Sequence, residues 1–273
     1  MIFQRDKQFN VLPSHMGLRK YIQYYNVVFP KKDTFLPQYT LMPNACGTLS
    51  FAFDGFSIEA ELWGATTMPI PLGTEPNGYR MLLLIQLSPY GLYQITGQNK
   101  VEFADKRLSL ADIDIELYGA LNQVFLSSKT VMELVDACDK IMYRRMEDII
   151  VSDALQSSAA LILNSHGQIK MKEVALQSCY SERQLGRLFL TQVGMSMKNF
   201  ARLARFHYVL KQIQTSPCFF AVLSQQAGYF DQAHFDKDFK AISGVSPQNY
   251  LKIMSDFYYD GTEFYHIISS KEE

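Results

Sequence analysis

The sequence predicts an α+β protein with a β-rich N-terminal domain, closed by two helices, and an all-helical C-terminal domain. Apolar residues alternate with a period of two between residues 49 and 62, and beyond residue 107 the period changes to about 3.6. Two helical units of the same design follow one another within residues 174–250. The expected boundaries are 1–150 for the first domain, 151–255 for the second, and 256–273 for an aromatic, acidic tail.

A β-hairpin is the clearest local prediction in the N-terminal domain. Apolar residues alternate with small or polar ones over 49–53 and again over 56–62, and an Asp-Gly pair between them is a favoured hairpin turn. Residues 79–87 are apolar enough to form a central strand. Residues 92–96 are predicted to form a further strand, so the domain should contain an antiparallel sheet.

Two amphipathic helices are expected to close this domain. Apolar residues recur at helical spacing over 113–124 and again over 131–142, and an antiparallel packing of the two helices is plausible. The second stripe has two interpretations, a seam between two copies of the chain or packing in the core of one copy. Another helix is expected over 153–163, with no Gly/Ser spacer before it, so the two domains should pack together.

The C-terminal domain contains nearly the same sequence pattern twice, fifty residues apart. Ser181 and Asp231 can each accept a hydrogen bond from free N–H groups at a helix start, and Gln184 completes a capping box in the first copy. Gly194 and Gly244 can end these helices in the left-handed conformation. A short helical run precedes each start, so each copy is predicted to be a helix-turn-helix unit.

Each of these helices is expected to bury one face and expose the other. The buried faces carry Leu185, Leu188 and Phe189 in one copy and Phe235, Phe239 and Ile242 in the other. The opposite faces carry Arg183, Gly186 and Arg187 in the first copy and Gln232, Ala233, Asp236, Lys237 and Lys240 in the second. In the major groove of DNA, Arg or Lys can donate to guanine and Gln can pair with adenine.

A single long helix is predicted between the two units, over residues 196–214. Its 19 residues span about 28 Å at 1.5 Å per residue, close to the roughly 34 Å between successive turns of the major groove. One rigid chain could therefore contact two grooves on one face of a duplex.

This long, spaced pattern resembles the double helix-turn-helix domain of the AraC family of bacterial transcription regulators. The residues that carry the resemblance are Ser181-Glu182-Arg183-Gln184-Leu185, Arg187, Phe189, Gly194-Met195-Ser196, Arg205, Gly228-Tyr229, Asp231-Gln232-Ala233-His234-Phe235, Phe239-Lys240 and Gly244-Val245-Ser246-Pro247-Gln248-Asn249-Tyr250. The resemblance implies double-stranded DNA as the partner. It also places base contacts at Arg183, Gly186, Arg187, Gln232, Ala233, Asp236 and Lys237, and phosphate contacts at Ser196 and Ser246.

The N-terminal domain resembles the β-rich sensor or companion domains of the same family. Some of these domains bind a small effector and others mainly dimerise, so a small-molecule effector and a homodimer are both open, as is RNA polymerase as a partner if the protein is an activator. Effector-binding candidates are Phe51, Phe53, Trp63 and Tyr93, which would otherwise be ordinary core or interface aromatics.

The charge distribution agrees with a nucleic-acid partner. Residues 168–252 hold 11 lysines and arginines against 5 aspartates and glutamates, a net charge of +6, whereas residues 1–152 have a net charge of −2. The tail after residue 252 has a net charge of −4 and could compete with DNA, although packing for stability is the simpler interpretation.

Composition argues against several other classes of protein. Cys46, Cys138, Cys179 and Cys218 fit no zinc or redox spacing, so reduced thiols in a cytoplasmic protein are expected. Neither a run of about 18 apolar residues nor a signal-peptide core is present, so neither a membrane protein nor a secreted one is expected.

No motif indicates an enzyme. The five histidines are scattered, and the sequence contains no Walker loop, dinucleotide fingerprint or nucleophile elbow, so no metal and no cofactor are expected. The main hypothesis is a sequence-specific DNA-binding transcription regulator. The alternative is a protein-interaction adaptor with a weakened DNA surface, because Gly186 and Asp236 are poor side chains for base contacts.

Overall fold

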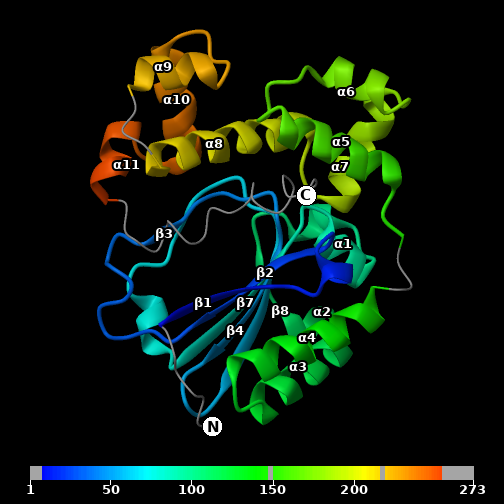
Figure 1. Cartoon of the computed structure of the whole chain (residues 1–273), viewed down its shortest axis with the longest axis vertical. Coiled ribbons are helices and arrows are strands. Elements are labelled where there is room, and N and C mark those ends of the chain that lie inside the picture. Colours follow the sequence, from blue (N-terminus) through cyan, green and yellow to red (C-terminus); the bar gives the residue numbers. More distant parts are fainter. Residues whose placement is uncertain (1–7, 147–149, 216–218, 254–273) are drawn as a thin grey trace.

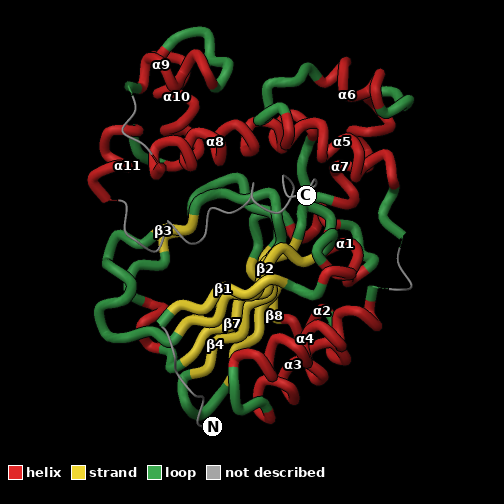
Figure 2. Tube along the Cα trace, in the orientation of Figure 1, coloured by secondary structure: helices red, strands yellow, loops and turns green. Residues whose placement is uncertain are grey.

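The computed structural model describes residues 8–146, 150–215 and 219–253 of the 273-residue chain (Figure 1). An N-terminal β-rich part and a C-terminal helical part lie one above the other in this view, and Figure 2 shows that strands occur only in the lower part. This arrangement confirms the predicted α+β class. Cys218 and the acidic tail lie outside the described residues.

A six-stranded antiparallel sheet forms the centre of the N-terminal part. Its strand order is β1-β2-β7-β4-β5-β8, and a second, two-stranded sheet pairs β3 with β6. The strands are β1 (Phe9–Pro13), β2 (Ile22–Val28), β3 (Thr40–Leu41), β4 (Thr48–Phe53), β5 (Ile58–Trp63), β6 (Ile70–Pro71), β7 (Met81–Leu87) and β8 (Arg107–Ser109). Short 3-10 turns are η1 (Met16–Leu18), η2 (Glu75–Gly78) and η3 (Lys100–Phe103).

The predicted hairpin is confirmed as β4 and β5. Leu49 pairs with Leu62 and Phe53 with Ile58 across the two strands. The turn is fixed by Asp54, whose side-chain Oδ1 accepts hydrogen bonds from the backbone N–H groups of Phe56 (2.7 Å) and Ser57 (2.8 Å). β7 is central, as predicted, because it lies between β2 and β4.

The strand predicted over residues 92–96 is wrong, because these residues form helix α1 (Gly91–Thr96). Leu92 and Ile95 are buried, which is helical spacing, and Gln94 is buried with them. Gly97 ends the helix in the left-handed conformation, with φ of 64°. A short apolar run bounded by glycines fits a strand and a single helical turn equally well, so its pattern could not decide.

The two faces of the large sheet have different neighbours. In β4, Leu49, Phe51 and Phe53 face the helices α2 (Leu110–Ile113), α3 (Ile115–Ser127) and α4 (Val131–Arg145), which lie along one side of the sheet in Figure 1. The alternate residues Thr48, Ser50 and Ala52 line a cavity on the other face. The sheet therefore separates an apolar core from an open internal space.

The two closing helices are confirmed, and the second apolar stripe is core packing. Leu134, Val135, Cys138 and Met142 of α4 are all at most 3% exposed and belong to the core between this helix and the sheet. Because the stripe is filled by residues of the same chain, it does not form a seam between two copies.

Seven helices form the described C-terminal part. They are α5 (Asp153–Asn164), α6 (Met171–Gln177), α7 (Glu182–Gln192), α8 (Met197–Thr215), α9 (Phe220–Gln226), α10 (Gln232–Ser243) and α11 (Pro247–Ile253). Figure 1 shows α8 running between two groups of helices, with α5, α6 and α7 near one end and α9, α10 and α11 near the other. The predicted linking helix is thus confirmed, displaced by one residue.

The two parts of the chain share one continuous apolar cluster. Ala45, Cys46 and Ala65 from loops beside the sheet belong to the same buried cluster as the residues of α5 to α11. The Nε2–H of His207, on α8, donates a hydrogen bond of 2.8 Å to the carbonyl oxygen of Pro43. The loop that carries Pro43 is therefore fixed directly against the linking helix.

A second contact between the parts joins η3 to the end of α7. Lys100 is 2% exposed, its Nζ donates to Thr96 Oγ1, and Nζ lies 4.1 Å from the centroid of the Phe103 ring. Burial lowers the pKa of Lys100 to about 7. The backbone of Lys100 packs closely against Gly194, so a Cβ atom at Gly194 would lie 2.9 Å from the Lys100 carbonyl oxygen.

The buried His207 predicts a loss of stability in acid. Burial lowers the pKa of His207 to about 4, opposed by its hydrogen bond to Pro43, so between pH 6.5 and 4 the unfolded chain takes up a proton that the folded chain does not. Stability from this residue is therefore full above pH 6.5 and falls as the pH drops towards 4, by on the order of 3 kcal/mol. His207→Gln keeps a donor for Pro43 without titrating, so its urea-unfolding free energy should fall less steeply with acid. Parallel slopes for the two proteins would contradict this assignment.

Candidate nucleic-acid interface

The first helix-turn-helix unit is fixed at its start by a capping box. The Oγ of Ser181 accepts from the backbone N–H of Gln184 (3.2 Å), and the Oε1 of Gln184 accepts from the backbone N–H of Ser181 (3.0 Å). Before it, Cys179 adopts the left-handed conformation with φ of 56°, where glycine would be unstrained. The turn is therefore formed at a small conformational cost.

The second unit uses a simpler cap with the same result. The Oδ1 of Asp231 accepts from the backbone N–H of His234 at 2.7 Å. Gly228 takes the left-handed conformation in the turn between α9 and α10, and Gly244 does so at the end of α10. Both predicted N-caps and the predicted capping box are confirmed.

The two helices expose equivalent faces. Residues 181–190 and 231–240 show the same order of exposed, half-buried and buried positions, residue for residue, at an offset of fifty. Leu185 and Phe235 are fully buried at one equivalent position, and Phe189 and Phe239 at another. The duplication inferred from the sequence therefore extends to which side of each helix is buried.

The candidate base-contacting residues lie as predicted on the outer faces of α7 and α10. Five of them are exposed and two, one in each helix, are half-buried at equivalent positions. The exposed residues are Arg183, Arg187, Gln232, Ala233 and Lys237, and the half-buried ones are Gly186 and Asp236. Arg187 and Lys237 occupy the same position in the two units, so each helix presents one cation at that point.

These cations are available to a ligand. Among the residues that the structure describes, no carboxylate lies within 4.0 Å of the charged groups of Arg183, Arg187 or Lys237. Asp236, the acidic residue on the outer face of α10, is half-buried. Burial raises the pKa of its carboxyl group, and a hydrogen bond from Gln232 opposes that change.

Two other cations of the helical part, Arg202 and Arg205, make structural contacts instead. Arg202 Nε lies 2.6 Å from Asp238 Oδ1, and the hydroxyl of Tyr229 donates to Asp238 Oδ2 at 3.0 Å. Arg205 donates to the carbonyl oxygen of Gly167 (2.9 Å), and its guanidinium lies 5.2 Å from the centroid of the Tyr229 ring. These contacts tie α8 to α10 and to the turn after α5.

Ser196 and Ser246 also occupy equivalent places, at the starts of α8 and α11. Each hydroxyl caps its helix, accepting from the backbone N–H of Asn199 (3.2 Å) and of Asn249 (3.3 Å) respectively. A helix start concentrates free N–H groups and the positive end of the helix dipole, which favour an anion such as phosphate.

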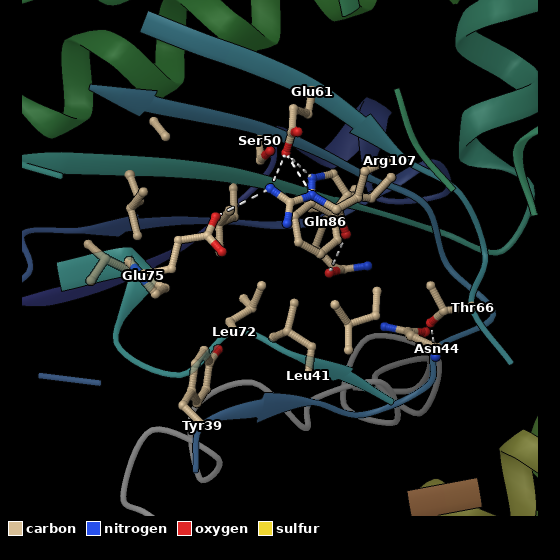
Figure 3. A pocket seen from close by; sticks show the side chains of 18 of the residues that line it. Tyr39, Leu41, Asn44, Ser50, Glu61, Thr66, Leu72, Glu75, Gln86 and Arg107 are labelled. Carbon is tan, nitrogen blue, oxygen red and sulfur yellow. Dashed lines mark hydrogen bonds and ion pairs between the residues drawn. The ribbon is translucent and has the colours of Figure 1, made fainter. Parts of the chain in front are cut away.

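A cavity of about 180 Å³ lies between the large sheet and the small β3–β6 sheet (Figure 3). Arg107 crosses it, with Nη2 3.0 Å from Glu61 Oε2 and 3.5 Å from Glu75 Oε1. The same guanidinium lies 4.3 Å from the centroid of the Trp63 ring. Gln86, on the central strand β7, is held by the hydroxyl of Thr48 at 3.1 Å.

Of the four predicted effector-binding aromatics, Trp63 alone lines this cavity. Phe51 and Phe53 point to the opposite face of the sheet, where their ring centroids each lie 6.2 Å from that of Phe125. Tyr93 packs against the cluster shared with the C-terminal helices. The prediction was based on side-chain size. Because side chains alternate between the two faces of a strand, Phe51 and Phe53 point into the core and not into the cavity.

The polar residues of the cavity were missed by the sequence analysis. Ser50, Glu59, Glu61 and Gln86 occupy the strand positions that alternate with the core residues. Charged and amide side chains at every second position of a strand indicate a polar cavity when both faces of the sheet are covered. That pattern would have identified these residues. No group of three or more potential metal ligands occurs among the described residues. Nor does any helix within the described ranges have both the length and the apolar character that a membrane span requires.

Comparison with known proteins agrees with the duplicated units. Residues 174–253 match the family model of a helix-turn-helix domain. The arabinose operon regulatory protein of Salmonella typhimurium is 26% identical over 147 residues, 50% of this chain and 52% of that protein. The Escherichia coli protein of the same name is 25% identical over 124 residues, 42% of each chain. The chain thus spans about half the length of the curated relatives it matches.

Two of the solved structures that match this chain are an isolated domain and a ligand-bound protein. The C-terminal domain of AraT, a response regulator from Geobacillus stearothermophilus, has a TM-score of 0.37 and 20% identity, covering 40% of this chain and 93% of that one. Unsaturated fatty acid bound ToxT from Vibrio cholerae has a TM-score of 0.41 and 12% identity, covering 93% and 98%. With its paired helix-turn-helix units, its domain match and its two arabinose-regulator relatives, the chain is similar to transcription regulators of the AraC family.

Proposed function

We propose that the protein is a sequence-specific DNA-binding transcription regulator whose helices α7 and α10 enter successive major grooves of one duplex. The main support for this proposal is that the two helices bury equivalent faces, so that Arg187 and Lys237 are exposed at the same position in each unit. Helix α8 separates the units by 19 residues, about 28 Å, close to the distance between neighbouring grooves.

The proposed recognition has a general and a specific component. The net positive charge of the C-terminal part attracts the phosphate backbone, and the backbone N–H groups at the starts of α8 and α11, beside Ser196 and Ser246, bind phosphates. Specificity comes from Arg183, Arg187 and Lys237 donating to guanine and from Gln232 pairing with adenine. Ala233 offers an apolar contact to a thymine methyl group.

An adaptor function is the weaker alternative. It depended on Gly186 and Asp236 being poor base-contacting side chains, but both are half-buried and flanked by exposed residues that can make the contacts. The two relatives named as operon regulators also favour DNA binding. The family consists of transcription regulators, so we propose no enzymatic activity. The proposed place of action is the cytoplasm, with RNA polymerase as a further partner if the protein is an activator and a second copy if it works as a homodimer.

We infer that a small molecule in the N-terminal cavity controls DNA binding. The loop before β4 supports this, because Met42, Asn44 and Cys46 line the cavity while the intervening Pro43 accepts the hydrogen bond from His207 on α8. A ligand that moves this loop acts directly on the helix that sets the spacing of the two DNA-contacting units. The cavity and the linking helix are thus coupled through one contiguous segment.

Selection of bound duplexes from a random oligonucleotide pool tests the main proposal. The expected result is one enriched sequence with two conserved blocks, about one helical turn apart, each matching one unit. Affinity for it should fall with salt at a log–log slope of about −0.9 for each phosphate neutralised. A pool that stays random after repeated selection would argue for the adaptor function.

Arg187→Ala tests the base-contacting assignment within that site. Because a bidentate arginine–guanine contact discriminates by about 1–3 kcal/mol, the variant should lose that much affinity for the selected duplex and tolerate any base at one position. Fluorescence anisotropy on a set of single-base variants of the duplex measures both effects. Arg144→Ala is the matched control, since Arg144 is exposed on α4, in the other part of the chain. Equal losses of affinity on every duplex would show that Arg187 contacts only the backbone.

A further inference from the structure

The cavity in the N-terminal part has an unequal balance of charge. Three carboxylates line it, those of Glu59, Glu61 and Glu75, against the single guanidinium of Arg107. Arg107 is already engaged by Glu61 and Glu75, at 3.0 and 3.5 Å, so its charge is balanced before a ligand arrives. An anionic ligand would have to displace one of these carboxylates or add a fourth negative charge.

The hydroxyl group of Tyr79 shows that the three carboxylates act on one region. Tyr79 donates a hydrogen bond of 2.7 Å to Glu59 Oε2. The pKa of Tyr79 is raised first by burial, then by this hydrogen bond and by the negative charges of Glu59, Glu75 and Glu61. The region around the hydroxyl is therefore at negative potential, and a positive group there would be stabilised.

The rest of the lining suits an apolar body with one polar group. Ser50 on β4 is 9% exposed, and its hydroxyl, which faces the cavity, makes no hydrogen bond to any described residue. Tyr39 and Leu72 supply aromatic and aliphatic surface opposite it (Figure 3), and Leu82 on the neighbouring strand β7 adds aliphatic surface on the same side as Ser50. Aromatic faces beside carboxylates are the surroundings in which proteins bind organic ammonium groups.

The volume limits the size of the ligand. At about 180 Å³ the space is slightly larger than an engineered apolar cavity of about 150 Å³ that holds benzene in another protein. We propose that the cavity binds a small organic cation, an ammonium group on an apolar body about the size of a benzene ring, beside Glu59 and Glu75. This assignment rests on the proposed control of DNA binding by a ligand and names the chemical class of that ligand.

The chain carries its own reporter for this site. Trp63 is the single tryptophan of the sequence and lines the cavity, next to Glu61, whose Oε2 accepts from its Nε1–H at 3.0 Å. Tryptophan fluorescence of the full chain can therefore be titrated with three probes that share one ring: cyclohexylmethylammonium, cyclohexylmethanol and cyclohexylacetate. None of these probes absorbs where tryptophan is excited.

The ammonium probe is expected to give a saturable change in fluorescence. Its affinity should exceed that of the alcohol by about fivefold and that of the carboxylate by more than tenfold, since each charged contact at a partly exposed site contributes up to about a factor of five. The proposal is overturned if the carboxylate or the alcohol binds as tightly as the ammonium, or if the ammonium gives no saturable change.

Two variants locate the ammonium group. Glu59→Gln and Glu75→Gln should each weaken binding of the ammonium probe by about fivefold and leave the affinity for cyclohexylmethanol unchanged. Glu116→Gln is the matched control, because the Glu116 side chain is 86% exposed on α3, behind the sheet. Glu61 is left intact because it accepts hydrogen bonds from both Arg107 and Trp63, whose fluorescence is measured. Thermal unfolding of each variant checks that it is folded, and equal losses for both probes would place the ammonium elsewhere and overturn the proposal.

A separate measurement keeps this result distinct from the proposed function. The same protein is assayed by anisotropy with the selected duplex, in the absence of probe. Fluorescence binding without DNA binding would support the cation site and reject the regulator, whereas DNA binding with preference for the carboxylate would do the opposite.

Discussion

Replacing Phe239 with alanine should lower the free energy of unfolding by about 3–5 kcal/mol, because it leaves a cavity in the core of the second helix-turn-helix unit. Phe239 is 1% exposed, and its ring centroid lies 5.1 Å from that of Phe206, 5.8 Å from Phe235 and 5.6 Å from Tyr250. The ring thus joins α8, α10 and α11. Urea unfolding followed by circular dichroism measures the loss.

The duplication supplies a matched comparison for this variant. Phe189 occupies the equivalent position in the first unit, is fully buried, and lies 5.3 Å from Phe200 on α8. Phe189→Ala should therefore cost about as much as Phe239→Ala, within the usual spread for large-to-small substitutions of about 3–5 kcal/mol. If either variant lowers the free energy of unfolding by less than about 1 kcal/mol, its unit repacks without the ring, and positions 189 and 239 are not equivalent.

Gly167→Ala should destabilise the chain by more than about 3 kcal/mol, because the site offers neither space nor a suitable backbone conformation. A Cβ atom at Gly167 would lie 2.0 Å from the carbonyl oxygen of Ala201 and 3.0 Å from the backbone nitrogen of Arg205, both on α8. The residue also has φ of +72°, which strains any L side chain. The substitution would push the turn after α5 away from the linking helix and break the hydrogen bond from Arg205 to the Gly167 carbonyl.

Gly119→Ala is the control for that experiment. Nothing lies within 4 Å of a Cβ atom at Gly119, which is inside α3, so alanine there should stabilise the chain by up to about 1 kcal/mol. Both variants are compared with the unaltered chain by thermal and urea unfolding. A Gly167→Ala protein as stable as the unaltered chain would mean that α5 and α8 do not meet through this close backbone contact.

Local patterns allowed much of the C-terminal part to be predicted. The caps at Ser181 and Asp231 and the buried rows that follow them depend on residues within one or two turns of each other, so the sequence contains the whole of the relevant geometry. The hairpin of β4 and β5 was predictable for the same reason, because the Asp54 turn and the alternating residues are contiguous.

What could not be predicted depends on segments far apart in the chain. The cavity requires β4, β5 and β7 to be covered by the small sheet of β3 and β6, which carry Leu41 and Ile70, and no local pattern shows which face of the large sheet it will cover. Size therefore suggested Phe51 and Phe53, which are core residues, and overlooked Glu61 and Arg107. The packing contact between Lys100 and Gly194 is equally non-local, because it joins η3 to the end of a helix that begins more than eighty residues later.

The continuous helix α8 has a consequence for the promoters that such a protein can serve. Since no flexible joint occurs along its 19 residues, the two points of attachment cannot adjust to half-sites of variable separation. Adding about five base pairs would carry one half-site to the far side of the duplex, beyond reach of the same molecule. In the target sites of the proposed regulator, the interval between the two blocks is thus expected to stay fixed, even where single bases within a block differ.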